Sequence, residues 1–308
     1  MGILSLFNAL PGAVAQGLIW GIMAIGVYIT FRILDIADLS VDGSFCTGAA
    51  VCIMLMQQGY NAWFSLICAF IAGLLAGLVT GIFHTWMGIP AILAGILTQL
   101  GLYSVNLKIM GKSNQAINVD KFDLLVSLRY IKGVALYKNT IFIVIVIIAV
   151  VIALLYCFFG TEMGCAMRAT GCNDKMARAQ GINTNFHRVL GLMISNALVA
   201  FSGALLGQYQ GFADVNMGRG AIVIGLAAVI IGEAVFGNFF NNFALKLVGV
   251  AIGSIIYYLV LQIVIWMGID TDLLKLLSAL VVAVFLAIPY WKNKWFSGFM
   301  SKGGGRSC

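Results

Sequence analysis

Long apolar runs, each close to 20 residues and separated by short polar stretches, dominate this sequence. An α-helix needs about 20 apolar residues to cross the hydrocarbon core of a bilayer, whereas membrane β-strands give shorter, alternating segments. Only 9% of the 308 residues are charged, against about 25% in soluble domains. Such a chain cannot cover itself with a water-compatible surface, so we expect an all-α, polytopic membrane protein.

The apolar runs predict about nine transmembrane helices (8–10), some of them discontinuous. We expect residues 1–308 to form a single transmembrane domain. The candidate spans are residues 12–31, 40–57, 61–86, 89–110, 139–159, 188–210, 219–237, 245–268 and 272–290.

Lys and Arg in the short loops predict the orientation, because basic loops stay on the cytoplasmic side. Segment 160–188 is basic, and the tail 291–308 carries Lys and Arg with no acid. We therefore expect both to be cytoplasmic and the N-terminus to lie outside. The parity of the span count, with one membrane crossing per span, also places loop 111–138 outside. That loop is itself basic, which conflicts with the rule.

The longest polar interruption in the C-terminal half is the segment Gly160–Asn183. Within it, Asn173 is a good N-cap, Asp174 suits the positive end of a helix dipole, and Gly181 is a natural helix stop. About seven helical residues remain between these signals, fewer than the dozen or so that an isolated helix needs in water. We predict that residues 160–185 form a cytoplasmic coupling segment that docks onto a soluble partner.

Two polar stretches, Asp35–Ser44 and Asp214–Gly220, stand directly before apolar runs and align with each other. They fit a transporter with an internal repeat of two halves, in which discontinuous helices place their N-termini near the membrane midplane. Ser40 or Asp42, and Asn216, are candidate N-caps, and free backbone N–H groups there could bind a carboxylate. Two surface loops would explain the same residues equally well. The predicted pathway residues are Asp38, Ser40, Asp42, Ser44, Asn216 and Arg219.

The sequence carries no HExxH, no GxSxG and no Cys or His ligand spacing. We therefore expect neither an enzyme nor a metal site, no cofactor bound by this chain, and no nucleic-acid partner. A chain with a docking helix and no catalytic set is expected to take its energy from another subunit. Glu233 is the costliest residue in its span, and we favour a structural role for it near the cytoplasmic end.

Several strings carry a family resemblance: MRATGCN at 167–173, AxxxGIN at 177–183, FSGALLG at 201–207 and AAVIIG at 227–232. Over residues 16–238 the chain resembles the permease subunits of ABC importers of the branched-chain amino-acid and ribose type. In that family the first two strings form the segment that contacts the ATPase. The ATPase-coupling residues that the capping signals and this resemblance together predict are Glu162, Arg168, Gly171, Asn173, Asp174, Lys175, Ala177, Arg178, Gly181, Ile182 and Asn183.

Three fuller strings, at 37–45, 81–111 and 230–238, resemble most a bacterial branch associated with uptake of aromatic amino acids, tryptophan above all. The resemblance implies a bacterial cell (inner or cytoplasmic) membrane location and a permease homodimer. It also implies a separate ATPase that binds ATP and Mg²⁺, and an extracellular substrate-binding lipoprotein that delivers the solute. Membrane lipid is the remaining partner.

The expected function is thus that of the membrane-spanning subunit of an ATP-driven importer for an amino acid such as tryptophan. Branched-chain amino acids, nucleosides and sugars stay open as substrates, because family members share the coupling segment and differ in solute. The rival of another class is an ion-coupled secondary transporter or channel, which would use the intramembrane carboxylates of Asp38, Asp42 and Glu233. A membrane enzyme is a distant third.

Overall fold

The computed structural model describes residues 3–119, 121–122, 124–131, 139–237 and 242–267, with isolated positions between 276 and 287. Its helices and strands are, in chain order, α1 (Ile3–Tyr28), the π-helix η1 (Ile29–Ile33), α2 (Val41–Gln57), α3 (Ala62–Thr85), α4 (Ala91–Met110), β1 (Asn114–Ala116), the 3₁₀-helix η2 (Leu128–Ile131), α5 (Thr140–Gly160), α6 (Glu162–Cys172), α7 (Asp174–Ala179), α8 (Thr184–Gln210), β2 (Phe212–Asp214), α9 (Ala221–Phe236) and α10 (Phe243–Trp266).

Among the described residues, six helical spans are long and apolar enough to cross a membrane: α1 with η1, α3, α4, α5, α8 and α10. Helices α2 and α9 are apolar but shorter. These eight helices coincide with eight of the predicted spans, which confirms an all-α, polytopic architecture. The predicted span 272–290 lies largely outside the described residues, so the count of nine stays a prediction, as does the internal repeat.

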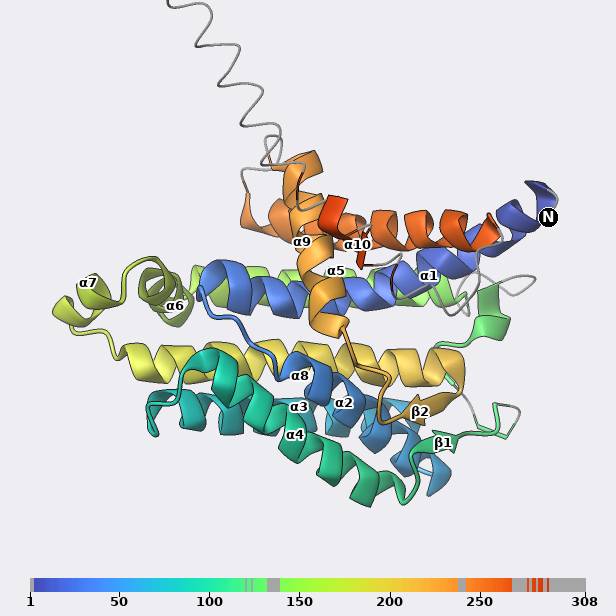
Figure 1. The fold of residues 1–308 in the computed structure, drawn as a ribbon, viewed down its shortest axis with the longest axis horizontal. Helices are drawn as coiled ribbons and strands as arrows, with labels where there is room; N and C mark the ends of the chain where they lie inside the picture. The colour runs from blue at the N-terminus through green and yellow to red at the C-terminus, as the bar shows by residue number, and fades with distance from the viewer. Residues whose placement is uncertain are drawn as a thin grey trace, which may run out of the picture.

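The two polar ends of the molecule are clearly separated. Helices α6 and α7 project at one end of the helix bundle, whereas β1 and β2 lie near the other (Figure 1). The two strands pair antiparallel, with Asn114 opposite Asp214, and Gln57 at the end of α2 donates to the Ala116 carbonyl at 2.7 Å. The described part of loop 111–138 therefore lies at the end opposite the 160–185 segment, as the parity argument requires.

Helices α2 and α9 are discontinuous, because each begins partway along the bundle (Figure 1). After η1 the chain reverses at Asp35, whose φ of 55° is left-handed, and runs back to Ser40, the residue before α2. Both Asp38 and Ser40 are buried. The middle of the stretch is therefore packed inside the bundle, whereas Asp35 and Ala37 are exposed, and the depth of the stretch in the membrane stays a prediction.

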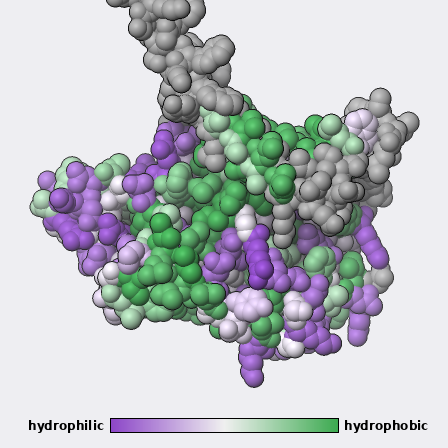
Figure 2. Space-filling model, viewed as in Figure 1, coloured by the Kyte–Doolittle hydropathy of each residue, from purple (hydrophilic) through white to green (hydrophobic). Residues whose placement is uncertain are grey.

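Helix α8 forms the centre of the bundle because small residues let α2 and α3 approach its backbone. A Cβ at Gly203 of α8 would meet the Phe45 carbonyl of α2, and a Cβ at Gly77 of α3 would meet the Leu192 carbonyl. The surface shows a hydrophobic band beside hydrophilic side chains over α6 and α7 (Figure 2). A smaller hydrophilic patch interrupts the band near the start of α9 (Figure 2).

This packing predicts opposite effects for the same substitution at two glycines. Gly203→Ala should lower the free energy of unfolding by about 1–3 kcal/mol, because the added methyl group overpacks the α2–α8 contact. Gly101→Ala in α4 should leave it unchanged or slightly higher, since nothing lies within 4 Å of a Cβ there. Thermal unfolding of the two detergent-solubilised variants measures the difference, and equal midpoints would contradict the packing.

Candidate functional site

The predicted coupling segment folds as a pair of short helices, α6 and α7. Thr161 accepts from the backbone N–H of Gly164 and caps α6. Asn173 accepts from the Met176 N–H at 3.1 Å and caps α7, so the N-cap predicted from the sequence is confirmed. A third cap, Asn183, accepts from the Phe186 N–H at 3.2 Å and begins α8.

The end of α7 is also fixed by backbone geometry. The N–H of Ile182 donates to the Ala177 carbonyl at 3.0 Å, and the N–H of Gly181 donates to the Arg178 carbonyl at 2.9 Å. These two bonds form a Schellman motif, which requires a left-handed residue after the helix. Gly181 supplies it with φ of 80°. The predicted stop at Gly181 is therefore confirmed.

Ion pairs attach α7 to the start of α8. The Asp174 carboxylate lies 3.0 Å from Arg178 one turn along, and 3.3 Å from Arg188 of α8. The Arg178 Nε donates to the Thr184 hydroxyl at 2.8 Å. Although α7 has only six residues, these contacts hold it within the chain itself. Helix α8 therefore supports this short helix from within the chain, so its length alone does not require a soluble partner, and docking onto one stays a prediction.

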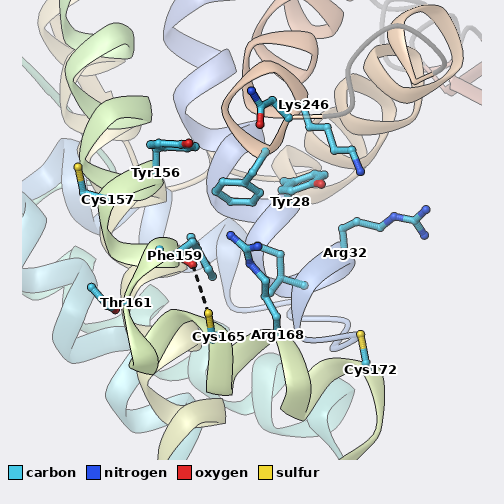
Figure 3. Close-up of a pocket in the computed structure, with 14 residues that line it drawn as sticks. Tyr28, Arg32, Tyr156, Cys157, Phe159, Thr161, Cys165, Arg168, Cys172 and Lys246 are labelled. Atoms are coloured by element: carbon cyan, nitrogen blue, oxygen red, sulfur yellow. Dashed lines mark hydrogen bonds between the residues drawn. The ribbon is translucent and has the colours of Figure 1, made fainter.

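Helix α6 is held against the bundle by Gly171 and Arg168. A Cβ at Gly171 would meet the Ile33 carbonyl, so only glycine allows this approach. Arg168 points away from the exposed tip, into a cavity of about 920 Å³ between α1, α5, α6 and α10 (Figure 3). Its guanidinium carbon lies 5.3 Å from the ring centroid of Phe159 and 4.6 Å from that of Phe243. Arg168 therefore links α6 to α5 and α10 by cation–π contacts.

The exposed tip of the coupling segment presents apolar side chains. Met176 of α7 is 50% exposed and Phe186 of α8 is 51% exposed, beside the exposed Lys175. Exposed apolar side chains at a polar end of the protein make this a candidate contact surface. Glu162 is exposed at the start of α6. We call Lys175, Met176 and Phe186 the coupling tip.

The two stretches that the sequence aligned meet inside the bundle. The N–H of Gly220 donates to one Asp42 oxygen at 2.9 Å, and the N–H of Ile222 donates to the other at 3.1 Å. The carboxylate at the start of α2 thus caps the N-terminus of α9. Gly218 packs against the Asp42 carbonyl, and its N–H donates to the Cys46 sulfur at 3.0 Å.

The prediction that Asn216 caps the following helix is wrong. Gly220 holds the N-cap position of α9. The Asn216 N–H donates to the Asp214 carboxylate at 2.6 Å, and the Asn216 side chain is exposed. The Asn216 N–H is used in a local turn with Asp214. The cap of α9 comes instead from Asp42, which is far away in the sequence.

A buried polar network fastens the reversed segment to α8. Asn196 donates to Asp38 at 2.7 Å and accepts from Ser44 at 2.7 Å. The Ser40 N–H donates to the same Asp38 carboxylate at 2.8 Å. All four side chains are buried. In this conformation the polar groups of Asp38, Ser40 and Ser44 bond to one another and to Asn196, so they join the segment before α2 and the start of α2 to α8.

Asp42 and Arg219, in contrast, line a cavity of about 370 Å³ between α2, α4 and the 215–220 segment. The two predicted pathway residues therefore come together at one site. Nearer the coupling segment, Glu233 pairs with Arg32 at 3.0 Å and lines a third cavity with Lys246. Glu233 therefore lies toward the α6–α7 end, as predicted, and pairs with Arg32, whereas its structural role stays a prediction.

Sequence reasoning missed Asn196, Asn106 and Gln99, which lie in apolar spans. Each is an uncharged polar residue in a membrane helix. The sequence analysis used this signal only for Glu233, and using it for uncharged polar residues as well would have found all three. It also missed Met176 and Phe186 of the coupling tip. An apolar residue in a short, charged helix was the available signal there.

Relatives of known description match nearly the whole chain. A tyrosine transport system permease protein of Clostridioides difficile is 38% identical over 280 residues, which cover 91% of each chain. The autoinducer 2 import system permease protein LsrC of Yersinia pseudotuberculosis is 27% identical, over 92% of this chain and 72% of that protein.

A solved structure that shares the fold is PsaBC from Streptococcus pneumoniae in complex with Fab, with a TM-score of 0.53 at 19% identity, covering 93% of this chain and 95% of that chain. The model of one family, described as the branched-chain amino acid transport system permease component, matches residues 10–288. With a helical bundle of membrane-spanning length and this match over most of its sequence, the chain belongs to that permease family and is a multi-pass protein of the bacterial inner membrane.

Proposed function

We propose that this permease is the membrane-spanning subunit of an ATP-driven importer for an aromatic amino acid. The coupling tip carries the proposal, because it is a capped, partly apolar surface projecting from the polar end of a permease. The similarity to a tyrosine transport permease supports an aromatic solute. Tyrosine and tryptophan are both candidates, and both share a ring and an α-amino acid group.

The partners follow from this role. A cytoplasmic ATPase dimer takes the coupling tips of two permease copies, and ATP and Mg²⁺ bind to the ATPase. A substrate-binding lipoprotein delivers the solute at the opposite, outer end, near β1 and β2. The permease itself binds no cofactor in this scheme and performs no hydrolysis.

The contacts of α6 and α7 suggest how movement is transmitted. Asp174 ties α7 to α8, and Arg168 ties α6 to α5 and α10. Helix α8 in turn carries Asn196, which holds the segment before α2. A displacement of the tip by the ATPase would shift α8 and the junction where α2 meets α9. Packed helices switch between discrete arrangements, so a small shift can open or close the pathway.

Uptake into proteoliposomes tests the proposal directly. The permease is reconstituted with its partner ATPase and substrate-binding protein, and radiolabelled tyrosine, tryptophan and leucine are supplied outside with ATP inside. We expect aromatic uptake that requires ATP and the ATPase, and much slower uptake of leucine. Uptake at the same rate without the ATPase would overturn the proposal.

The coupling tip makes a second prediction. Met176→Glu combined with Phe186→Glu should abolish co-purification of the ATPase and reduce ATP-driven uptake at least about tenfold, because charges replace the apolar contact. Met267→Glu is the matched control, since Met267 is 67% exposed but follows α10 at the other end. Size-exclusion chromatography checks that all variants stay folded. Equal ATPase binding by both would rule out this tip as the docking surface.

The ion-coupled rival depends on carboxylates that exchange an ion during transport. In this structure Asp38 is bonded to Asn196, Asp42 to the start of α9, and Glu233 to Arg32. Each acid has a structural partner. These bonds favour the ATP-driven importer over the rival.

Glu233→Gln separates the two functions. The Glu233–Arg32 pair is partly exposed, and such pairs contribute about 0–1 kcal/mol. We therefore expect uptake to stay within about threefold of wild type in the proteoliposome assay. An ion-coupled mechanism that runs through Glu233 instead predicts complete loss of uptake in this variant and collapse of wild-type uptake when a protonophore or sodium ionophore is added.

A further inference from the structure

The cavity between α2, α4 and the 215–220 segment has the size of a small-molecule site. Its volume is about 370 Å³, near the lower end of the range of about 300–1,000 Å³ that ligand pockets occupy. Opposite charges line it, Asp42 on α2 and Arg219 in the segment before α9. No ion pair joins the two residues. A cavity that holds an acid and a base apart is suited to a ligand that carries both charges.

The carboxylate of Asp42 is fixed in place by α9. It accepts one N–H at each oxygen, from Gly220 and from Ile222, and a carboxylate has about four acceptor sites. It can therefore accept further hydrogen bonds from a cation in the cavity without leaving α9. The guanidinium of Arg219 forms no ion pair with any residue that the structure describes, so its N–H groups are available to a ligand carboxylate.

Asn106 supplies the second observation that points to a ligand. It is only 1% exposed, and its amide nitrogen donates to the Gly43 carbonyl at 3.4 Å. Its amide oxygen is buried and has no hydrogen-bond partner, yet Asn106 lines the cavity. Buried acceptors are rarely left unpaired, because the loss of hydration is costly. A donor from a bound molecule would satisfy this oxygen after a small movement of the side chain, because almost none of the oxygen's surface is accessible in this conformation.

The remaining wall is formed by α4. Tyr103 and Leu100 lie on it three residues apart, on one helix face, and both line the cavity. Gln99 adds an uncharged polar group on the same helix. The cavity thus offers a ring and an aliphatic side chain beside its polar groups, which suits a ligand with a flat apolar part.

We propose that this cavity is a binding site for a zwitterionic aromatic amino acid on its way through the permease. Arg219 binds the α-carboxylate, Asp42 and the Asn106 amide oxygen accept from the α-ammonium group, and the Tyr103 ring packs against the side-chain ring. The proposal rests on the proposed function for its direction of transport. It adds that the permease itself selects the solute, beyond any selection by the binding protein.

Binding at such a site must be weak, because conduction requires that the solute leave as readily as it enters. The full-length permease in lipid nanodiscs is therefore titrated with tritiated L-tyrosine in a scintillation proximity assay, without ATPase or binding protein. Unlabelled tyramine, which lacks the carboxylate, and 3-(4-hydroxyphenyl)propionate, which lacks the ammonium group, compete. We expect L-tyrosine to compete about 10–100-fold better than either, since each has lost a charged hydrogen bond.

Point variants test which side chain of the cavity binds which part of the ligand. Arg219→Gln should weaken tyrosine binding about 10–100-fold and leave tyramine binding unchanged, so the preference for tyrosine over tyramine disappears. Lys108→Gln is the matched control, because Lys108 is an exposed cation of α4 outside the cavity. Tyr103→Ala should reduce the preference for tyrosine over alanine, and Tyr103→Phe should restore it. Thermal unfolding confirms that each variant is folded.

Equal competition by tyrosine and tyramine on the wild type would overturn the proposal, and so would an equal loss of binding in Lys108→Gln and Arg219→Gln. The result also separates this site from the proposed function. ATP-driven tyrosine uptake with no tyrosine binding to the permease would refute the site alone. Selective binding without ATP-driven uptake would refute the importer alone and keep the site.

Discussion

The interior of this permease depends on one contact, in which the carboxylate of Asp42 on α2 caps the start of α9. A helix that begins inside a membrane leaves backbone N–H groups without water, and each must find an acceptor in the protein. Asp42 supplies both of its oxygens to α9. This is possible only because α2 also begins inside the bundle, which brings its first turn level with that of α9. The carboxylate of α2 and the free N–H groups at the start of α9 thus satisfy each other.

The position of α2 in turn depends on α8. Asn196 holds Asp38, and glycine contacts bring α2 against the α8 backbone. Helix α8 extends to Arg188, which pairs with Asp174 in the coupling segment. Helix α8 therefore connects the polar end of the molecule to the buried junction of α2 and α9. In the proposed importer, that continuity, and not the coupling segment alone, lets a partner at the coupling tip act on the interior.

Sequence reasoning located the spans, the caps at Asn173 and Gly181, and the two interrupted stretches, because these signals are local: apolar length, capping residues and helix breakers. It could not find the cap that Asp42 gives to α9, because that contact joins residues 178 or more positions apart. It placed Asp38, Ser40 and Ser44 among the pathway residues, which stays a prediction, and it did not find the buried network that joins them to Asn196. Pairing between residues of different helices cannot be read from the spacing within either segment.

The occupied N-terminus of α9 has a consequence for recognition. An anionic group could in principle bind at a helix N-terminus inside a membrane, which is what the sequence suggested for these helices. Here the protein's own carboxylate takes that position, so the positive end of α9 is already neutralised. A carboxylate of the solute therefore needs another positively charged partner. Arg219, in the segment directly before α9, is available in the same cavity. The same acid that stabilises the broken helix thereby moves anion recognition from the backbone to a side chain, where substitution can change it without dismantling the fold.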